Sequence, residues 1–140
     1  MKTFTTRDWK TIAHWTATGL FAGLMLLSAS MYLSGAAPIR EALATLGYPA
    51  YILVILGTAK LLGSFALLQT RLPRLREWAY AGFTINLIGA TASHLLAGDA
   101  LGHAIVPAAL LVPLAVSHAL QPVRQHSVID EIAVRITRAA

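Results

Sequence analysis

Four long apolar stretches dominate the sequence, at residues 12–33, 50–69, 78–97 and 103–120. At about 1.5 Å per helical residue, each stretch is close to the length that crosses the roughly 30 Å hydrocarbon core of a bilayer. A segment inside a membrane must satisfy its own backbone hydrogen bonds, so runs of this kind fold as helices. The sequence therefore predicts an all-α protein, an antiparallel bundle of four transmembrane helices.

The composition supports the same class. Of the 140 residues, 56% are hydrophobic and 12% are charged, whereas ordinary soluble domains carry about 25% charged residues. We expect one membrane domain, residues 1–140, in contact with the lipid bilayer. Segment 127–138 mixes apolar and charged residues, a pattern that fits either a short amphipathic surface helix or a frayed tail.

The chain contains no cysteine. This excludes a disulfide framework, thiolate metal sites and a cysteine nucleophile within the polypeptide. A redox role would therefore require a bound cofactor or a partner protein.

Basic residues flank the apolar stretches unevenly. They precede the first stretch, fill the second loop and follow the fourth stretch, whereas the other two loops have little net positive charge. Cytoplasmic loops of membrane proteins carry an excess of Lys and Arg, so we expect both termini in the cytoplasm. We attribute the net charge of +5 to topology and attraction to anionic lipid, and we expect no nucleic-acid partner. The three basic groups are Lys2, Arg7 and Lys10; Arg71, Arg74 and Arg76; and Arg124, Arg135 and Arg138.

Lys60 is the most informative single residue, because it lies near the middle of the second stretch. A charge at that depth costs about 2.5 kcal/mol or more, so the side chain must face protein or water. Lys60 either binds an anionic or carbonyl-bearing ligand, or relays a proton, or is a structural amine bonded to carbonyls. Ser64 shares its helix face. Asn86 matches its depth in the third stretch, where its amide oxygen could accept a hydrogen bond from the ammonium.

His94 lies toward the outer end of the third stretch, and Asp99 and His103 follow it in the next loop. Tyr80 falls on the same helix face as His94. The three loop-proximal residues could gather at one mouth of the bundle. As metal ligands they form an incomplete set, so we interpret them as a pocket mouth or a hydrogen-bonded helix end and expect no metal.

His14 and His118 should lie at similar depth near the inner ends of the first and fourth stretches. Two histidines could hold a haem. Two interfacial histidines that meet headgroups and water explain them better, so we expect no haem.

Several short pieces of sequence between Gly47 and Asp99 form a combined pattern that resembles the DoxX-like family of small bacterial membrane proteins. The likeness is close in the middle third of the chain and extends to the outer helices only in length and hydropathy. The pieces are Tyr48-Pro49, Gly57-Thr-Ala-Lys60-Leu-Leu-Gly63, Leu72-Pro-Arg74-Leu-Arg-Glu77-Trp78-Ala-Tyr80-Ala-Gly82-Phe83, Ala92-Ser-His94 and Gly98-Asp99.

The resemblance implies a four-helix fold in the bacterial inner membrane. Family names point to subunits linked to quinone-dependent sulfur oxidation, but most DoxX-like proteins have no assigned activity. A function taken from fold alone would be an analogy. The resemblance draws attention to the residues of this chain that match the family pattern. They are Lys60, Glu77, Trp78, Tyr80, Gly82, His94 and Asp99.

Three functions remain open from the sequence. The first is a binding protein, or an accessory subunit of a membrane redox system, that holds a lipophilic molecule such as a quinone between its helices. The second is an isomerase or oxidoreductase in which Lys60, Tyr80 or His94 transfers protons. The third is a structural or transport partner in a homo-oligomer or larger complex. The predicted ligand-binding residues are Lys60, Asn86, His94, Tyr80, Ser64 and Asp99.

Overall fold

The computed structural model describes residues 6–121, with side chains from Asp8 onward. Every regular element in this range is a helix, which confirms the all-α prediction. The segment 127–138 lies outside the described residues. The helices are α1 (Thr6–Leu33), α2 (Ala37–Thr45), α3 (Ile52–Leu68), α4 (Pro73–Leu96) and α5 (Leu101–Ala119).

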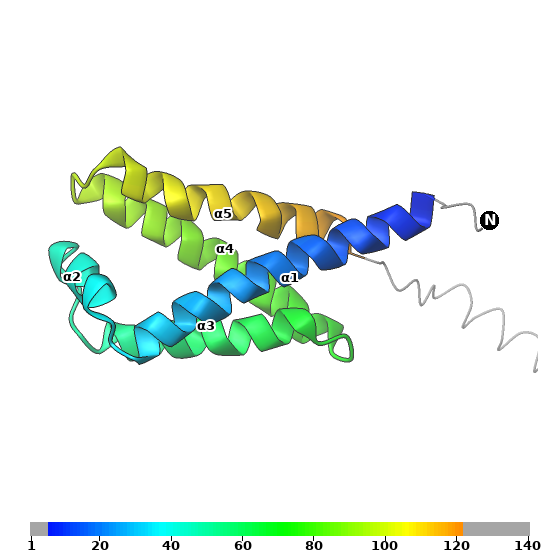
Figure 1. The fold of residues 1–140 in the computed structure, drawn as a ribbon, viewed down its shortest axis with the longest axis horizontal. Helices are drawn as coiled ribbons and strands as arrows, with labels where there is room; N and C mark the ends of the chain where they lie inside the picture. The colour runs from blue at the N-terminus through cyan, green and yellow to red at the C-terminus, as the bar shows by residue number, and fades with distance from the viewer. Residues whose placement is uncertain (1–5, 122–140) are drawn as a thin grey trace, which may run out of the picture.

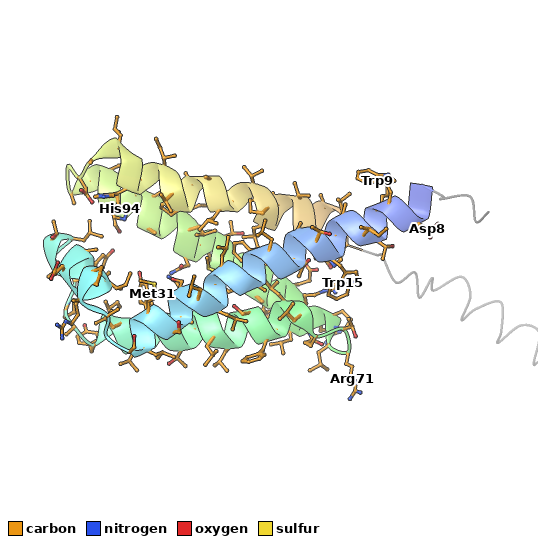
Figure 2. The ribbon with its side chains drawn as sticks, in the orientation of Figure 1. Asp8, Trp9, Trp15, Met31, Arg71 and His94 are labelled. Atoms are coloured by element: carbon orange, nitrogen blue, oxygen red, sulfur yellow. The ribbon has the colours of Figure 1, made fainter. Side chains whose placement is uncertain are left out.

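The four long helices form a closed ring of neighbours. Helix α1 packs against α3 and α5, and α4 packs against the same two helices. The turns at 69–72 and 97–100 are too short to do anything but reverse the chain, so α3–α4 and α4–α5 are antiparallel hairpins. Both ends of the described chain lie at one end of the bundle (Figure 1). Asp8 and Arg71 lie at that end, and His94 lies at the other (Figure 2).

The short helix α2 is an addition to the predicted elements. It lies at the end of the bundle away from the described termini (Figure 1). Gly35 and Gly47, with φ of +63° and +80°, adopt the left-handed backbone that bounds it on either side. Pro38 fits in its first turn, where a missing N–H costs nothing. Only Leu43 of this helix is buried, so a search for membrane-length apolar runs had no signal for it.

Two described helices are long and apolar enough to cross a membrane, at Asp8–Leu33 and Leu101–Ala119. Helix α3 is apolar but has 17 residues. Helix α4 is longer than its apolar stretch, because it begins at Pro73 and takes Arg74, Arg76 and Glu77 into its first turns. Proline is favoured at the first helical position, which sets this start.

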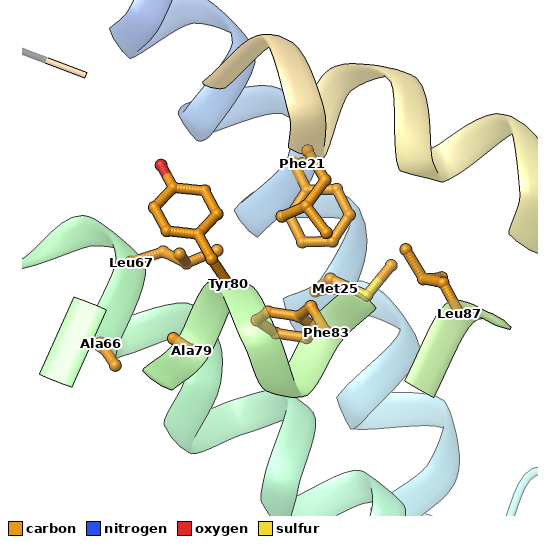
Figure 3. Packing of buried hydrophobic residues seen from close by; sticks show 9 residues of the cluster. Phe21, Met25, Ala66, Leu67, Ala79, Tyr80, Phe83 and Leu87 are labelled. Carbon is orange, nitrogen blue, oxygen red and sulfur yellow. The ribbon is translucent and has the colours of Figure 1, made fainter. Parts of the chain in front are cut away.

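The core is a cluster of buried, mostly apolar side chains drawn from all four long helices (Figure 3). Phe21 of α1 and Phe83 of α4 meet edge to face at its centre, with ring centroids 5.1 Å apart. Such pairs add about 0.5–1.5 kcal/mol beyond their buried area. The outer surface is also apolar: Leu62, Ile85 and Ile105 are all exposed.

Candidate functional site

A groove of about 270 Å³ runs between α3 and α4. Several of its residues are glycine or alanine, so the two helices leave room between their facing surfaces. Its lining is mostly apolar, and Lys60 and Asn86 contribute polar side chains. The lining residues are Ala59, Lys60, Leu62, Gly63 and Ala66 of α3, with Leu75, Trp78, Ala79, Gly82, Phe83 and Asn86 of α4.

Helix α1 holds the ammonium of Lys60. Lys60 Nζ donates a hydrogen bond of 2.9 Å to Ser28 Oγ and lies 3.8 Å from the centroid of the Tyr32 ring. Ser28 and Tyr32 are four residues apart and so share one face of α1. A hydroxyl and an aromatic face both stabilise a cation at a partly desolvated position. Sequence spacing singled out neither residue, because it does not indicate which face of α1 meets α3.

Asn86 lines the groove together with Lys60. Among the described residues, the hydrogen-bond partner of the Lys60 ammonium is Ser28 and not Asn86. The side-chain amide of Asn86 has no protein hydrogen bond within the described range. An amide offers two donors and one acceptor, so this side chain can bind a polar group that enters the groove.

Ser64 and Tyr80 lie outside the groove. The buried Ser64 hydroxyl donates to the backbone oxygen of Lys60, at 2.7 Å. Tyr80 faces α5, where its hydroxyl is 2.6 Å from Ser117 Oγ and its ring meets that of His118 edge to face, with centroids 4.9 Å apart. Both hydroxyls therefore serve helix packing in this structure.

A buried polar network joins α1, α4 and α5 around Ser117. The Ser117 carbonyl can only accept, so His14 Nδ1 carries the proton in their 2.7 Å hydrogen bond. Thr18 Oγ1 also contacts Ser117 Oγ. His14 Nε2 is buried without a hydrogen-bond partner in the described part of the chain. His118 Nε2 instead bonds Glu77 at 2.9 Å, so the two histidines have different partners. His14 is fully buried, which corrects the prediction that it meets headgroups and water at the interface.

The turn between α4 and α5 brings His94, Asp99 and His103 together. His94 Nδ1 is 2.8 Å from Asp99 Oδ2, and His103 Nδ1 is 2.9 Å from Asp99 Oδ1. The backbone N–H of Ala100 donates to the same carboxylate at 2.8 Å. Hydrogen bonds from His103, His94 and Ala100, in that order, hold the pKa of Asp99 at about 2. This cluster lies at the α4–α5 turn and is separate from the groove.

The residues predicted to bind a ligand thus divide among three places. Lys60 and Asn86 line the groove, Ser64 and Tyr80 are bonded within the packed helices, and His94 and Asp99 belong to the turn. Trp78 and Gly82 also line the groove. Both belong to the matched family pattern, although neither was among the predicted ligand residues.

The family model described as DoxX-like matches this chain over residues 16–117. The chain belongs to the DoxX-like family. The match extends from α1 almost to the end of α5, well beyond the middle third in which the sequence resemblance is clear. No curated protein and no solved structure matches the chain. Family membership makes this a DoxX-like membrane protein, and any specific activity must be argued from its own side chains.

Proposed function

We propose that this DoxX-like protein crosses the bacterial inner membrane four times and binds a lipophilic, carbonyl-bearing molecule of the quinone type in the groove between α3 and α4. The observation that carries the proposal is the mostly apolar groove, whose lining includes the polar side chains of Lys60 and Asn86. Ligand sites between bundle helices commonly combine apolar walls with a few such groups.

The packing of the helices supports four membrane crossings. The two candidate spanning helices are α1 and α5. Helix α3 packs against α1, α4 packs against α5, and α3 and α4 pack against each other, so all four helices form one closed ring. Helix α4 has 24 residues, or about 36 Å of length, and α3 and α4 expose Val54, Phe65 and Ile88. Exposed apolar side chains on both helices are well accommodated by lipid, whereas large apolar patches are rare on soluble proteins. The excess of Arg and Lys at one end favours cytoplasmic termini.

The groove chemistry favours a ligand with carbonyl oxygens. An ammonium has three N–H donors, of which Lys60 uses one on Ser28. The Asn86 amide adds donors at the same groove. A neutral carbonyl compound dissolved in the membrane can accept these hydrogen bonds without bringing a charge into the apolar walls, which would be costly. Trp78, 80% exposed beside the groove, offers a flat apolar surface to a ring.

The proposal gives the protein an accessory role. Without cysteine, the protein would hold a quinone while partner subunits or further copies of the chain exchange electrons with it. The geometry gives less support to an enzyme that uses Lys60, Tyr80 and His94 together. Their partners are Ser28, Ser117 and Asp99, respectively, so they do not converge on one substrate atom as acid–base catalysis requires.

Co-purification tests this proposal. The protein is purified in mild detergent from a quinone-containing bacterial host, and its organic extract is analysed by mass spectrometry. We expect about one quinone per wild-type protein and a loss of at least tenfold in Lys60→Met, whose side chain keeps the apolar stem. The exposed Lys10→Met is the matched control and should keep the quinone. A wild-type preparation without quinone would contradict the proposal and favour a structural or transport partner.

A further inference from the structure

Two histidines and a carboxylate converge at the α4–α5 turn. One ligand atom from each of His94, Asp99 and His103 lies within 4.8 Å of the other two. In four-coordinate zinc sites, bonds of about 2.0–2.2 Å place the ligand atoms about 3.4 Å apart. Small side-chain shifts therefore suffice to bring the three ligand atoms to that spacing.

The backbone prepares this arrangement. His94 lies in the last turn of α4, and His103 lies in the first turn of α5, four residues after Asp99. Gly98, at φ +69°, turns the chain between the two helices. The Ala100 N–H bond to Asp99 Oδ1 orients the carboxylate, as groups behind a metal ligand commonly do. The side chains of His94 and Asp99 are 18% and 21% exposed, whereas that of His103 is 66% exposed and can adjust.

We propose that His94, Asp99 and His103 bind a divalent transition-metal ion of the Zn²⁺ class. Each imidazole would present Nδ1 to the ion, with its proton on Nε2, and Asp99 would supply one carboxylate oxygen. Two imidazoles and a carboxylate suit Zn²⁺ better than Mg²⁺ or Ca²⁺, which prefer oxygen ligands. Three protein ligands leave one position of a tetrahedral ion open to water or a further ligand.

This site is independent of the groove. It lies at the C-terminal end of α4, at the end of the bundle opposite to Arg71 (Figure 2). It shares no residue with the groove lining. It also differs from the other histidine–carboxylate contact in the described structure. His118 and Glu77 form a pair with a single imidazole, which provides fewer ligands and hence a natural control.

The test uses metal-free protein, treated with a chelator and purified in mild detergent without a polyhistidine tag. Zn²⁺ binding is measured by isothermal titration calorimetry, and Co²⁺ is added separately to observe the visible absorption of a four-coordinate ion. We expect one Zn²⁺ per chain, about 100-fold weaker binding in His94→Ala and in His103→Ala, and a change within about twofold in His118→Ala. Loss of one ligand should cost at least as much as the 10- to 100-fold seen when a group behind a ligand is lost.

A second readout separates binding from damage to the fold. Zn²⁺ should raise the melting temperature of the wild type, because it binds the folded state. It should not raise that of the His94→Ala/His103→Ala variant, provided that this variant melts cooperatively without metal. Equal Zn²⁺ affinity in the wild type and this double variant would overturn the proposal, as would an equal loss of affinity in His118→Ala.

Discussion

The Lys60 ammonium donates a 2.9 Å hydrogen bond to Ser28 Oγ and so joins the middle of α3 to α1. Replacement of Ser28 by alanine removes this acceptor and leaves the ammonium with the Tyr32 ring as its remaining contact. A hydrogen bond to a charged group contributes about 1.5–3 kcal/mol. We therefore expect Ser28→Ala to lower the free energy of unfolding in detergent by about that amount.

Ser30→Ala is the matched control for this prediction. Ser30 is exposed, and its hydroxyl donates within its own helix to the Leu27 carbonyl, so its loss should change stability by less than about 0.5 kcal/mol. Equal stability of Ser28→Ala and Ser30→Ala in denaturant titrations would contradict the assigned role of Ser28.

Close packing at Gly63 gives a second prediction. A Cβ atom at this position would lie 2.8 Å from the Phe83 ring, which already fills the core beside Phe21. Gly63→Ala should therefore lower stability by about 1–3 kcal/mol through overpacking. Gly23→Ala, with no atom within 4 Å of the added carbon, should be neutral or stabilising. Thermal melts measure the stability of both variants. Equal melting temperatures of Gly63→Ala and Gly23→Ala would contradict the close packing of Gly63 against Phe83.

The contacts of Asp99 predict a specific acid titration. Its pKa of about 2 lies below the ordinary value of 3.8. A lowered pKa in the folded state means that the ionised carboxylate stabilises the fold above pH 3.8, and that this contribution is lost as the pH falls through about 2. Carbon-13 NMR of chelator-treated protein labelled at aspartate should find this pKa in the wild type and a value nearer 3.8 in His94→Ala/His103→Ala. A wild-type value near 3.8 would be evidence against the hydrogen bonds.

Tyr80 separates packing from ligand binding. Because its hydroxyl bonds Ser117 and does not line the groove, Tyr80→Phe should lower stability by about 0.5–1.5 kcal/mol and change quinone affinity by less than twofold. In a double-mutant cycle with Ser117→Ala, the coupling energy between Tyr80 and Ser117 should account for most of this stability loss. A large loss of quinone affinity with unchanged stability would instead make Tyr80 a ligand group.

The sequence predicted the long helices because their apolar runs have the length and continuity of the elements themselves. The predicted antiparallel arrangement agrees with the α3–α4 and α4–α5 hairpins, whose short connections allow no other path. The short helix α2 was missed because its nine residues bury only Leu43. The start of this helix was predicted at residue 78, whereas α4 begins at Pro73, because Arg74 and Glu77 interrupt the apolar pattern but not the helix.

The candidate site was predicted less completely, since contacts between helices depend on rotations that spacing does not fix. Lys60 and Asn86 line one groove, but the hydrogen-bond partner of the ammonium is Ser28 on α1. Proximity in sequence was a better guide at the α4–α5 turn, where His94 and Asp99 are only five residues apart and were predicted to lie close together. Trp78 and Gly82 were signalled only by their place in the family pattern.

The most direct test of the central claim is a steric block of the groove. Gly82 lines the groove, and nothing lies within 4 Å of a Cβ at this position, so Gly82→Leu should fill the space without strain. Gly89 lies two turns farther along α4, is equally open and is not part of the lining, which makes Gly89→Leu the matched control.

The affinity of the purified proteins for a short-chain alkyl benzoquinone is measured by quenching of tryptophan fluorescence, to which Trp78 should contribute. We predict that Gly82→Leu weakens binding at least tenfold while Gly89→Leu binds like the wild type. Wild-type affinity in a folded Gly82→Leu protein would contradict the proposal that the α3–α4 groove is the binding site.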